Sequence, residues 1–347
     1  MMVDKSILQA FIKLGGFLVH FCDNANKKSH WEEKLEEAIV QAGYGNAWFT
    51  KENTLFALKQ WGELLTEENL NYWLSSYASR KNTSKKTVAI LMAGNIPLVG
   101  FHDFICVLLT GHKALVKLSS NDKVLLPFFA NFLIDINKEL KDCITFTEEK
   151  LQNFDAVIAT GSNNTGRYFE YYFGKHPNII RKNRNSIAVL LGSETEKELS
   201  ALGEDIFRYF GLGCRSVSKL FVPEGYKFNL FFESIFNYGE LINNSRYANN
   251  YDYNKAVYLM SDAKLLDNNF LLLKEDTAYG SPIGTLYYEY YENLEALNNI
   301  LHANTNKLQC IVSNGIIENA IAIGTTQKPS LTDYADGVDT IQFLLDL

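Results

Sequence analysis

From about residue 86 onward, the chain alternates short, uninterrupted apolar runs with longer segments of mixed polarity. The apolar runs have the length of buried strands and lie at 88–92, 114–118, 155–160 and 187–191. The segments between them have the length of helices, at 98–110, 122–140 and 164–174. Short apolar strands that alternate with helices are typical of βαβ units, whose parallel sheet is covered on both faces. The pattern therefore predicts a doubly wound α/β lobe of the kind that binds nucleotides.

Helical periodicity precedes this lobe, and a second α/β pattern follows it. Apolar side chains recur at helical spacing in 4–19 and 29–41, with Ser29 as a cap, and a third helix is expected at 66–79. From residue 193 we expect a smaller α/β lobe with a helix at 195–210 and strands at 219–223, 257–260, 283–287 and 309–313. The expected parts are therefore 1–85 (a helical segment), 86–192 (the nucleotide-binding domain), 193–326 (the smaller domain) and 327–347 (a C-terminal segment that packs back on the body). The polar run Ser79–Lys86 marks the first boundary.

Composition narrows the class of protein. The 347 residues exceed what a single core usually fills, which is about 250–300 residues, so two lobes are expected. Lys and Arg total 33 against 40 Asp and Glu, and this balance argues against a nucleic-acid-binding protein that works by bulk charge. Charged residues near the N-terminus and inside the apolar run 98–110 argue against a signal peptide and a membrane span. Five cysteines without CxxC spacing argue against disulfides and fit a reduced cytoplasm, and the histidines show no metal-ligand spacing.

Three strand-to-helix or strand-to-loop junctions in the first lobe carry candidate binding residues. Asn95, in Ala93–Pro97, follows the first strand, and its side-chain amide can donate a hydrogen bond to an oxyanion. Lys117–Ser120 ends the second strand and offers a cation that can reach a ribose or a phosphate. Thr160–Arg167 contains Gly161, Ser162 and Gly166, and a helix that begins there attracts pyrophosphate. Each junction alone is also compatible with an ordinary turn.

Cys214 is the candidate nucleophile, because it lies in the glycine-flanked stretch Gly211–Ser216 beside Arg215. A thiol near a cation and exposed backbone N–H groups forms more thiolate. The other four cysteines lie in apolar settings that are typical of core packing: Cys22, Cys106, Cys143 and Cys310.

In their order along the chain, these four places resemble the aldehyde dehydrogenase superfamily. Its asparagine loop, lysine-containing cofactor loop, Gly-Ser turn and nucleophile loop are similar to the stretches at 93–97, 117–120, 160–166 and 211–222. Within that superfamily the chain resembles the LuxC-like acyl-CoA reductases, whose shorter members share the tail Asp333–Thr340. The resemblance covers about residues 86–347. It implies an aldehyde-dehydrogenase-like fold, with a Rossmann-like cofactor lobe and a catalytic domain at 193–326.

The resemblance also implies a reaction and a cofactor. Hydrolytic members carry a water-activating Glu where this chain has Ile180–Asn185, which contains no carboxylate, so a reductase is expected rather than a hydrolytic dehydrogenase. Cofactor contacts are implied for Lys117, Ser119 and Ser120, for Gly161, Ser162 and Gly166, and for Glu275. Because Ser120 stands where NAD-preferring members often have a Glu, NADPH is the expected cofactor.

The expected function is reduction of an acyl-CoA or acyl-protein thioester to an aldehyde through an acyl group on Cys214, with Asn95 as an oxyanion donor. Two alternatives stay open: a CoA-acylating aldehyde dehydrogenase that acts on short aldehydes, and a catalytically silent partner subunit of an acyl-protein synthetase. Expected partners are the acyl thioester and an acyl-protein synthetase or acyl carrier, and a homo-oligomer stays open. Nucleic acid and metal are not expected.

Overall fold

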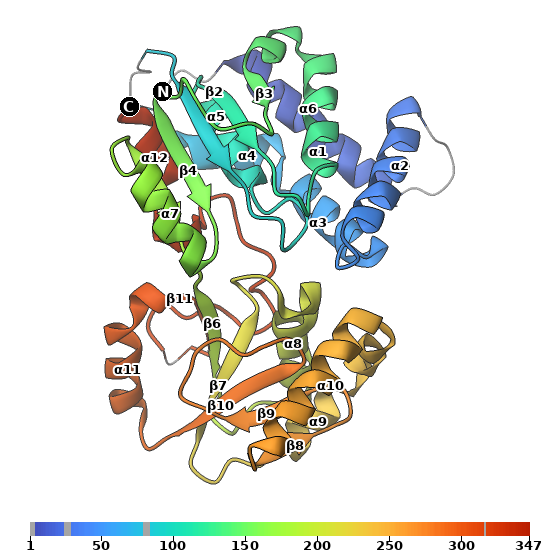
Figure 1. The fold of residues 1–347 in the computed structure, drawn as a ribbon, viewed down its shortest axis with the longest axis vertical. Helices are drawn as coiled ribbons and strands as arrows, with labels where there is room; N and C mark the ends of the chain where they lie inside the picture. The colour runs from blue at the N-terminus through green and yellow to red at the C-terminus, as the bar shows by residue number, and fades with distance from the viewer. Residues whose placement is uncertain (1–3, 24–28, 79–83, 316) are drawn as a thin grey trace. The chain divides into compact units, whose positions relative to one another are not determined.

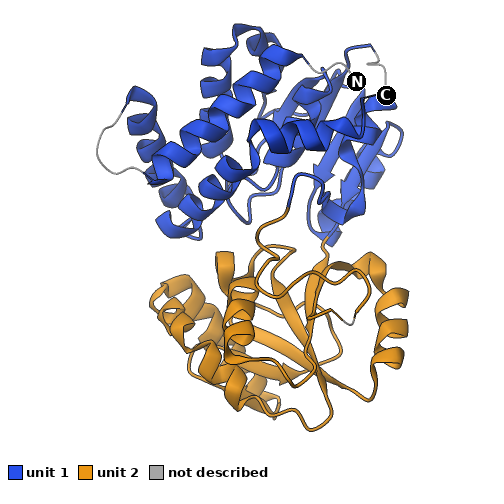
Figure 2. Ribbon diagram, turned by 180° about the vertical axis from the view of Figure 1, so that it is seen from behind, with its two compact units in different colours: residues 1–182, 330–347 blue, residues 183–329 orange. Residues whose placement is uncertain are grey.

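The computed structural model describes residues 4–23, 29–78, 84–315 and 317–347. The chain divides into two compact units, shown in different colours in Figure 2. Unit 1 comprises Met1–Lys182 and Ser330–Leu347, and unit 2 comprises Asn183–Pro329. Each unit contains its own sheet, so each is described separately below.

Unit 1 begins with the helical segment expected from the sequence. Its helices are α1 (Lys5–Asp23), α2 (His30–Gly45), α3 (Lys51–Leu64) and α4 (Glu67–Ser75). Ser29 caps α2 in a capping box with Glu32, as the sequence predicts. By length and composition α1 could cross a membrane, and its buried side chains, among them Phe11 and Leu14, pack in the hydrophobic core of unit 1. That packing accounts for the apolar character of the helix.

A parallel sheet with strand order β3-β2-β1-β4-β5 forms the centre of unit 1 (Figure 1). Its strands are β1 (Thr87–Leu91), β2 (Lys113–Lys117), β3 (Ile144–Phe146), β4 (Ala156–Thr160) and β5 (Asn178–Arg181). The helices α5 (Phe101–Leu109), α6 (Leu125–Ile136) and α7 (Asn163–Phe173) lie between strands in the chain. Val88 and Ile90 belong to the core cluster that contains α5 and α6, whereas Ala89 belongs to the cluster of Phe169 and Phe173 on α7. Both faces of the sheet are therefore covered, which confirms the doubly wound α/β prediction.

The C-terminal segment Ser330–Leu347 returns to unit 1 and ends in α12 (Thr340–Leu345). Trp73 Nε1 donates to Tyr334 Oη at 2.6 Å, and Tyr77 Oη donates to Asp339 Oδ2 at 2.6 Å. The tail motif thus forms hydrogen bonds with α4 and the turn after it. Residues 79–83 of the polar run that we took as a domain boundary lie outside the described residues.

Unit 2 contains a sheet with strand order β11-β6-β7-β10-β9-β8, in which only the β8–β9 pair is antiparallel. Its strands are β6 (Asn185–Val189), β7 (Val217–Pro223), β8 (Leu265–Asp267), β9 (Leu272–Glu275), β10 (Thr285–Tyr291) and β11 (Leu308–Val312). Its helices are α8 (Glu196–Phe207), α9 (Asn229–Ser234), α10 (Ser245–Met260) and α11 (Leu294–Ala303). Leu220 and Leu286 pack in the cluster of α8 and α9, and Phe221 packs in the cluster of α11 on the other face.

The structure adds four strands that the sequence did not predict, β3, β5, β8 and β9, and it contradicts two of the sequence expectations. The strand predicted at 257–260 is the last turn of α10, which Asn244 caps by accepting from Arg246 N and Tyr247 N. The strand at 185–189 pairs with β7 and β11, so unit 2 begins at Asn183 rather than at residue 193. An apolar strand buried on both faces has no pattern that tells which of two sheets it joins.

Candidate active site

Three candidate loops of unit 1 follow neighbouring parallel strands. Asn95 follows β1, Ser119 and Ser120 follow β2, and the turn of Gly161 follows β4. In the strand order β2-β1-β4, the chain proceeds to one side from β1 to β2 and returns to the other side with β4. Ligands of open α/β sheets bind outside the carboxyl ends of the strands at such a switch point. The sheet therefore brings these candidate residues to one edge.

The loop of Asn95 is held in a strained conformation. Leu98 has φ of 60°, and a left-handed conformation costs an L-residue about 1–2 kcal/mol. The Leu98 side chain is buried in the core, its N–H donates to Asp122 Oδ2 at 3.1 Å, and Asn46 Nδ2 donates to Gly94 O at 3.3 Å. Asn95 itself is exposed. The loop thus presents the Asn95 side chain to solvent from a fixed backbone.

Some polar side chains of the loop after β2 form hydrogen bonds within the protein. Lys117 Nζ donates to Glu149 O at 2.9 Å, and Ser119 Oγ accepts from Asn121 N at 3.2 Å. Ser120 is exposed, and Ser119 is half-buried. The ammonium group that we expected to contact the cofactor is therefore bound to a carbonyl oxygen in this structure, whereas Ser120 is accessible.

The turn after β4 begins α7. Ser162 is the N-cap of α7, and its Oγ accepts from Thr165 N at 3.2 Å. A Cβ at Gly161 would lie 3.0 Å from the side chains of Thr165 and Phe169, and a Cβ at Gly166 would lie 2.9 Å from Lys182 Cγ. Gly166 is buried, so its lack of a side chain serves the packing of α7 against Lys182. Gly161 and Ser162 remain at the edge where a ligand can approach.

All five cysteines lie in the described residues, and Cys214 alone is exposed. Burial raises the pKa of Cys22 to about 11 and raises the pKa of Cys106 well above its ordinary value. Cys143 and Cys310 are also buried. Because the thiolate is the nucleophilic form, exposure favours Cys214 as the reactive thiol.

The loop of Cys214 is anchored on both sides of the cysteine. Ser186 Oγ donates to Cys214 O at 2.9 Å and accepts from Cys310 N at 3.2 Å, so β6 and β11 hold the cysteine peptide. Arg215 Nε donates to Thr326 O at 2.6 Å. The Arg215 side chain, which the sequence suggested as a cation beside the thiol, therefore anchors the loop to the chain near 326.

A buried carboxylate completes this anchor. Asp205 on α8 is fully buried, and its Oδ1 accepts from Thr326 N and Thr326 Oγ1, each at 2.9 Å. Its Oδ2 accepts from Gly324 N at 2.6 Å. Burial raises the pKa of Asp205, and these three donors oppose the rise. Sequence reasoning missed Ser186 and Asp205, because a polar residue in an amphipathic segment is normally assumed to face solvent.

The entry to the loop is strained as well. Tyr209, Phe210 and Gly211 all have positive φ, at 55°, 58° and 75°. Tyr209 and Phe210 are buried, so core packing holds two L-residues in a conformation that they rarely adopt. Their left-handed turn redirects the chain from α8 toward Cys214.

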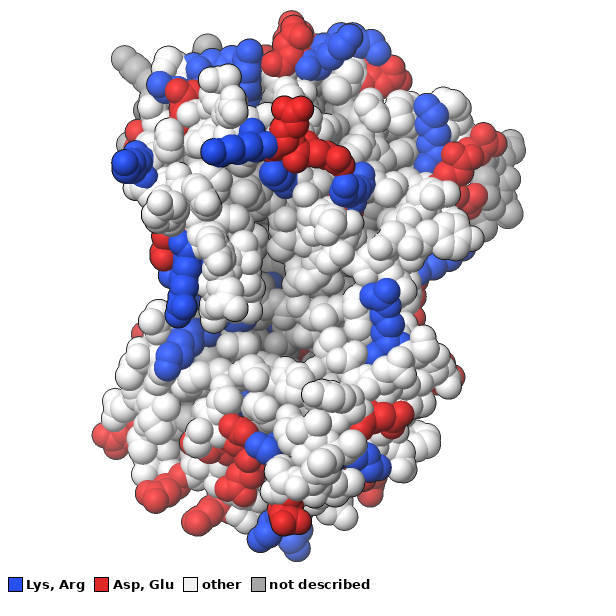
Figure 3. All heavy atoms as spheres, viewed as in Figure 1, with Lys and Arg blue, Asp and Glu red and all other residues white. Residues whose placement is uncertain are grey.

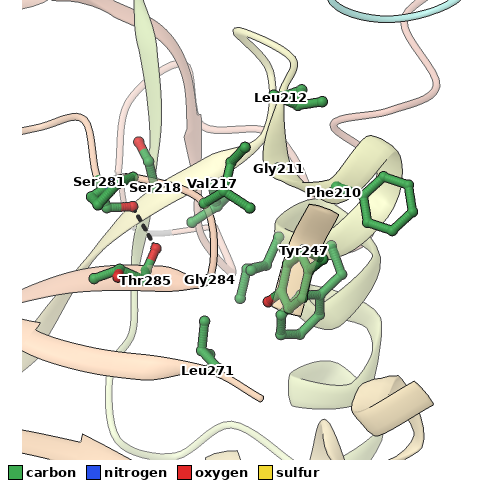
Figure 4. Close-up of a pocket in the computed structure, with 14 residues that line it drawn as sticks. Phe210, Gly211, Leu212, Val217, Ser218, Tyr247, Leu271, Ser281, Gly284 and Thr285 are labelled. Atoms are coloured by element: carbon green, nitrogen blue, oxygen red, sulfur yellow. Dashed lines mark hydrogen bonds between the residues drawn. The ribbon is translucent and has the colours of Figure 1, made fainter. Parts of the chain in front are cut away.

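A cavity of about 220 Å³ lies next to this loop within unit 2 (Figure 4). Leu212 and Val217, which flank Cys214 in the chain, both line it. Figure 4 shows Phe210 and Tyr247 on one side and Ser281 and Thr285 on the other. Apolar and aromatic residues are the more numerous in its lining, among them Ile206, Phe207, Phe210, Val217, Tyr247 and Leu271. Polar atoms nevertheless contribute more of the accessible lining than apolar atoms do, so the cavity offers both kinds of contact next to the loop of Cys214.

Glu275, by contrast, does not lie beside Cys214 in the strand register. It is exposed at the end of β9 and pairs with Tyr288 of β10, which pairs in turn with Leu220 of β7. The Cys214 loop precedes β7. In the strand register, Glu275 is therefore aligned with Leu220 inside β7 and not with the Cys214 loop.

Charged side chains of both signs are mixed on the face shown in Figure 3, where Lys and Arg side chains lie among Asp and Glu side chains in each unit. Among the described residues, no group of three or more His, Cys, Asp or Glu is placed to hold a metal ion.

A comparison with models of protein families shows to which family the chain is related. The model of the LuxC acyl-CoA reductase family matches residues 26–233, more than half of the chain. The chain belongs to the LuxC acyl-CoA reductase family. The matched range includes the loops of Asn95, Ser120, Gly161 and Cys214.

A related sequence and solved structures of similar fold are consistent with this family assignment. The long-chain acyl-protein thioester reductase of Aliivibrio fischeri is 25% identical over 172 residues, which are 44% of this chain and 35% of that protein. Aldehyde dehydrogenase 21 of Physcomitrella patens has a TM-score of 0.63 at 11% identity, covering 98% of this chain and 87% of that chain. An indole-3-acetaldehyde dehydrogenase in complex with NAD+ has a TM-score of 0.60 at 13% identity, covering 89% and 75%. The structures establish an aldehyde dehydrogenase fold, which confirms the predicted fold class.

Proposed function

We propose that this chain reduces an acyl thioester to an aldehyde through an acyl group carried on Cys214. The observation that carries the proposal is the exposed Cys214 in a loop anchored by Ser186 and Arg215, in a chain of the LuxC acyl-CoA reductase family. The relative from Aliivibrio fischeri, a long-chain acyl-protein thioester reductase, supports a thioester as the substrate.

The reaction balances with one external reductant. The Cys214 thiolate forms a bond to the thioester carbonyl carbon, and the carbon–sulfur bond of the substrate breaks to release CoA or a protein thiol. When bound, a reduced nicotinamide cofactor would supply the hydride, which leaves the acyl-cysteine as a thiohemiacetal anion on Cys214. This anion re-forms its carbonyl bond, the carbon–sulfur bond to Cys214 breaks, and the aldehyde leaves while Cys214 is restored as the thiolate. Both steps pass through an oxyanion, for which we propose Asn95 as a donor.

The edge of the unit 1 sheet suits a dinucleotide. It combines a switch point, the N-terminus of the 11-residue helix α7, and a glycine at 161 whose added Cβ would lie only 3.0 Å from its neighbours. Lys117, Ser119, Ser120, Gly161 and Ser162 are the residues that would hold it. For Gly166 we propose a packing role, and Glu275 remains a proposed ribose contact of unit 2.

We propose NADPH rather than NADH, because the exposed Ser120 carries no charge that would repel a 2′-phosphate. Ser120→Glu should lower kcat/KM for NADPH more than for NADH, since the added carboxylate repels the 2′-phosphate. The matched control is Ser120→Gln, which has similar size and no charge. A wild-type protein that prefers NADH would contradict the proposal.

The cavity beside Cys214 is where we propose that the acyl group binds. At about 220 Å³ it exceeds the about 150 Å³ cavity that holds benzene in a protein core. The acyl donor is acyl-CoA or an acyl group on a partner protein such as an acyl-protein synthetase or acyl carrier.

Reduction rather than hydrolysis is proposed because the segment 180–185 offers no water-activating carboxylate. Arg181 Nη1 and Nη2 bind Asp103 at 2.5 and 2.9 Å in the core of unit 1, and Lys182 pairs with Glu170 at 2.7 Å. The next carboxylate along the chain, Glu194, accepts from Leu191 N and Gly192 N. An acyl-cysteine would therefore persist until it is reduced.

Intact-mass spectrometry after incubation with a panel of acyl-CoAs, without nicotinamide cofactor, tests the proposal. The wild type and Cys310→Ala should gain one acyl mass, and Cys214→Ala should gain none. Acylation of Cys214→Ala would overturn the assignment, and an unlabelled wild type would favour a silent partner subunit. Steady-state rates in both directions then separate a reductase from a CoA-acylating aldehyde dehydrogenase.

A further inference from the structure

Asp122 lies where the loops after β1 and β2 meet. Its Oδ2 accepts from Leu98 N at 3.1 Å, and this hydrogen bond is buried. Leu98 is the residue with positive φ in the loop that presents Asn95. Since a left-handed L-residue persists only where its surroundings hold it, the Asp122 carboxylate is part of what maintains this turn.

The same aspartate is built into the other loop. Asp122 N donates to Ser119 O at 3.2 Å, which closes the turn that contains Ser120. A Cβ at Gly94 would lie 2.6 Å from Ser119 Oγ and 2.7 Å from Ser119 Cβ. The backbone beside Asn95 therefore touches the loop of Ser119 with no room for a side chain. The two loops therefore pack directly against each other, and Asp122 links them by hydrogen bonds to Leu98 and Ser119.

The link through Asp122 costs folding free energy, because its second carboxylate oxygen is buried and forms no hydrogen bond among the described residues. Asp122 is 8% exposed, and its Oδ1 is buried without a hydrogen-bond partner among the described residues. Burial raises the pKa of Asp122 to about 6, and the N–H groups of Leu98 and Leu125 oppose the rise. The nearest cations in the chain are bound elsewhere, Lys117 to Glu149 O and Lys123 to Glu148. An ionised acceptor forms a stronger hydrogen bond than a neutral one, so the charge strengthens the hold on Leu98.

We propose that Asp122 is a positioning residue, which holds the Asn95 loop against the cofactor loop through Leu98 and so fixes both for the reaction. The inference rests on the proposed function, in which Asn95 serves the oxyanion and the loop of Ser120 serves the cofactor. Asp122 acts through Leu98 and Ser119 and does not touch the reacting atoms.

Hydrogen exchange and acylation of three variants test this role. In Asp122→Ala, the Leu98 amide should exchange about tenfold faster or more, because it loses its acceptor. The rate of single-turnover acylation by a fixed acyl-CoA should fall by a similar factor. Asp122→Asn keeps an acceptor oxygen and should restore most of both. Asn121→Ala, an exposed neighbour in the same loop, is the matched control and should match the wild type.

The outcomes separate this inference from the proposed function. Faster exchange at Leu98 with an unchanged acylation rate would overturn the positioning role while acylation of Cys214 stands. A wild type that is not acylated would contradict the proposed function, and the exchange result would still report whether Asp122 holds the loop. Unchanged exchange in Asp122→Ala would refute the inference directly.

Discussion

The loops of Asn95 and Cys214 are each held by a buried aspartate, and the two aspartates are satisfied to different degrees. Asp205 of unit 2 accepts three hydrogen bonds from Gly324 and Thr326. Asp122 of unit 1 accepts from Leu98 N through Oδ2, and the Leu125 N–H also lowers its pKa, but its buried Oδ1 forms no hydrogen bond among the described residues. A buried carboxylate with its oxygens in use is a stable anchor, whereas an unused buried oxygen costs stability.

The difference shows two ways of fixing a loop that carries a proposed catalytic residue. In unit 2 the strain at Tyr209 and Phe210 is offset by a satisfied network around Asp205. In unit 1 both the strain at Leu98 and the unsatisfied Asp122 lie beside the proposed site. Strain and unsatisfied groups of this kind tend to cluster at functional sites. The four predictions that follow test this contrast, beginning with the largest expected effect.

Asp205→Ala should lower the free energy of unfolding by about 3–5 kcal/mol, because it leaves the two buried donors of Thr326 and the half-buried N–H of Gly324 without an acceptor. Urea unfolding of the wild type and the variant measures this. Asp205→Asn retains a carbonyl oxygen and should lose less. A loss below about 1 kcal/mol for the alanine variant would mean that the network is not the anchor of the loop.

Asn95→Ala should reduce the rates of acylation and reduction together by about 10²–10³, equivalent to about 2.7–4 kcal/mol of transition-state stabilisation. The melting temperature and cofactor affinity should change little, because the Asn95 side chain is exposed. Single-turnover kinetics, cofactor titration and thermal unfolding on one variant give all three values. Unchanged acylation would remove Asn95 from the mechanism, and parallel losses of stability and cofactor affinity would assign it a structural role.

Asp122→Asn should raise the free energy of unfolding at pH 8 by about 2–3 kcal/mol, at 1.36 kcal/mol per pKa unit. The folded carboxyl titrates at about 6 and the unfolded one at 3.8. Between these values the folded state binds more protons, so wild-type stability falls as pH rises from about 4 to about 6. Urea unfolding measured from about pH 3.5 to about pH 8 should show a smaller loss of unfolding free energy in the variant than in the wild type. Parallel curves for the two proteins would contradict this account of Asp122.

Ser162→Ala should lower the free energy of unfolding by about 1 kcal/mol, because it removes the N-cap of α7. Ser162→Asp keeps a cap acceptor and should retain stability, but its charge should weaken cofactor binding at the same helix end. Comparing unfolding and cofactor affinity for the two variants separates capping from binding. Equal cofactor affinity in all three proteins would move the cofactor away from this turn.

Much of the fold could be predicted from the sequence, because buried parallel strands are continuous apolar runs between helices. The β1, β2 and β4 runs have this form, and the predicted cap at Ser29 precedes its helix. The sheet to which β6 belongs could not be predicted, since an apolar run contains no information about its partners. The strand expected at 257–260 failed because local composition suggested a strand where the helix α10 continues.

The candidate site was only partly predictable. The exposed Cys214 was singled out by its glycine neighbours, and the structure gives it the exposure that this choice requires. The roles of Asp122 and Asp205 could not be predicted, because each depends on backbone N–H groups that the fold brings from elsewhere in the chain. Arg215 illustrates the same limit: its proximity to Cys214 in the sequence suggested a cation for the thiol, but its Nε binds Thr326 O.

The most direct test of the proposed reaction is a single turnover of the isolated acyl-enzyme. The wild type is acylated with acyl-CoA, freed of excess substrate and mixed with NADPH, and aldehyde and remaining acyl mass are measured together. The account predicts that the acyl mass on Cys214 disappears as an equal amount of aldehyde forms, with little free acid. Loss of the acyl group as free acid, or its persistence in the presence of NADPH, would contradict the account.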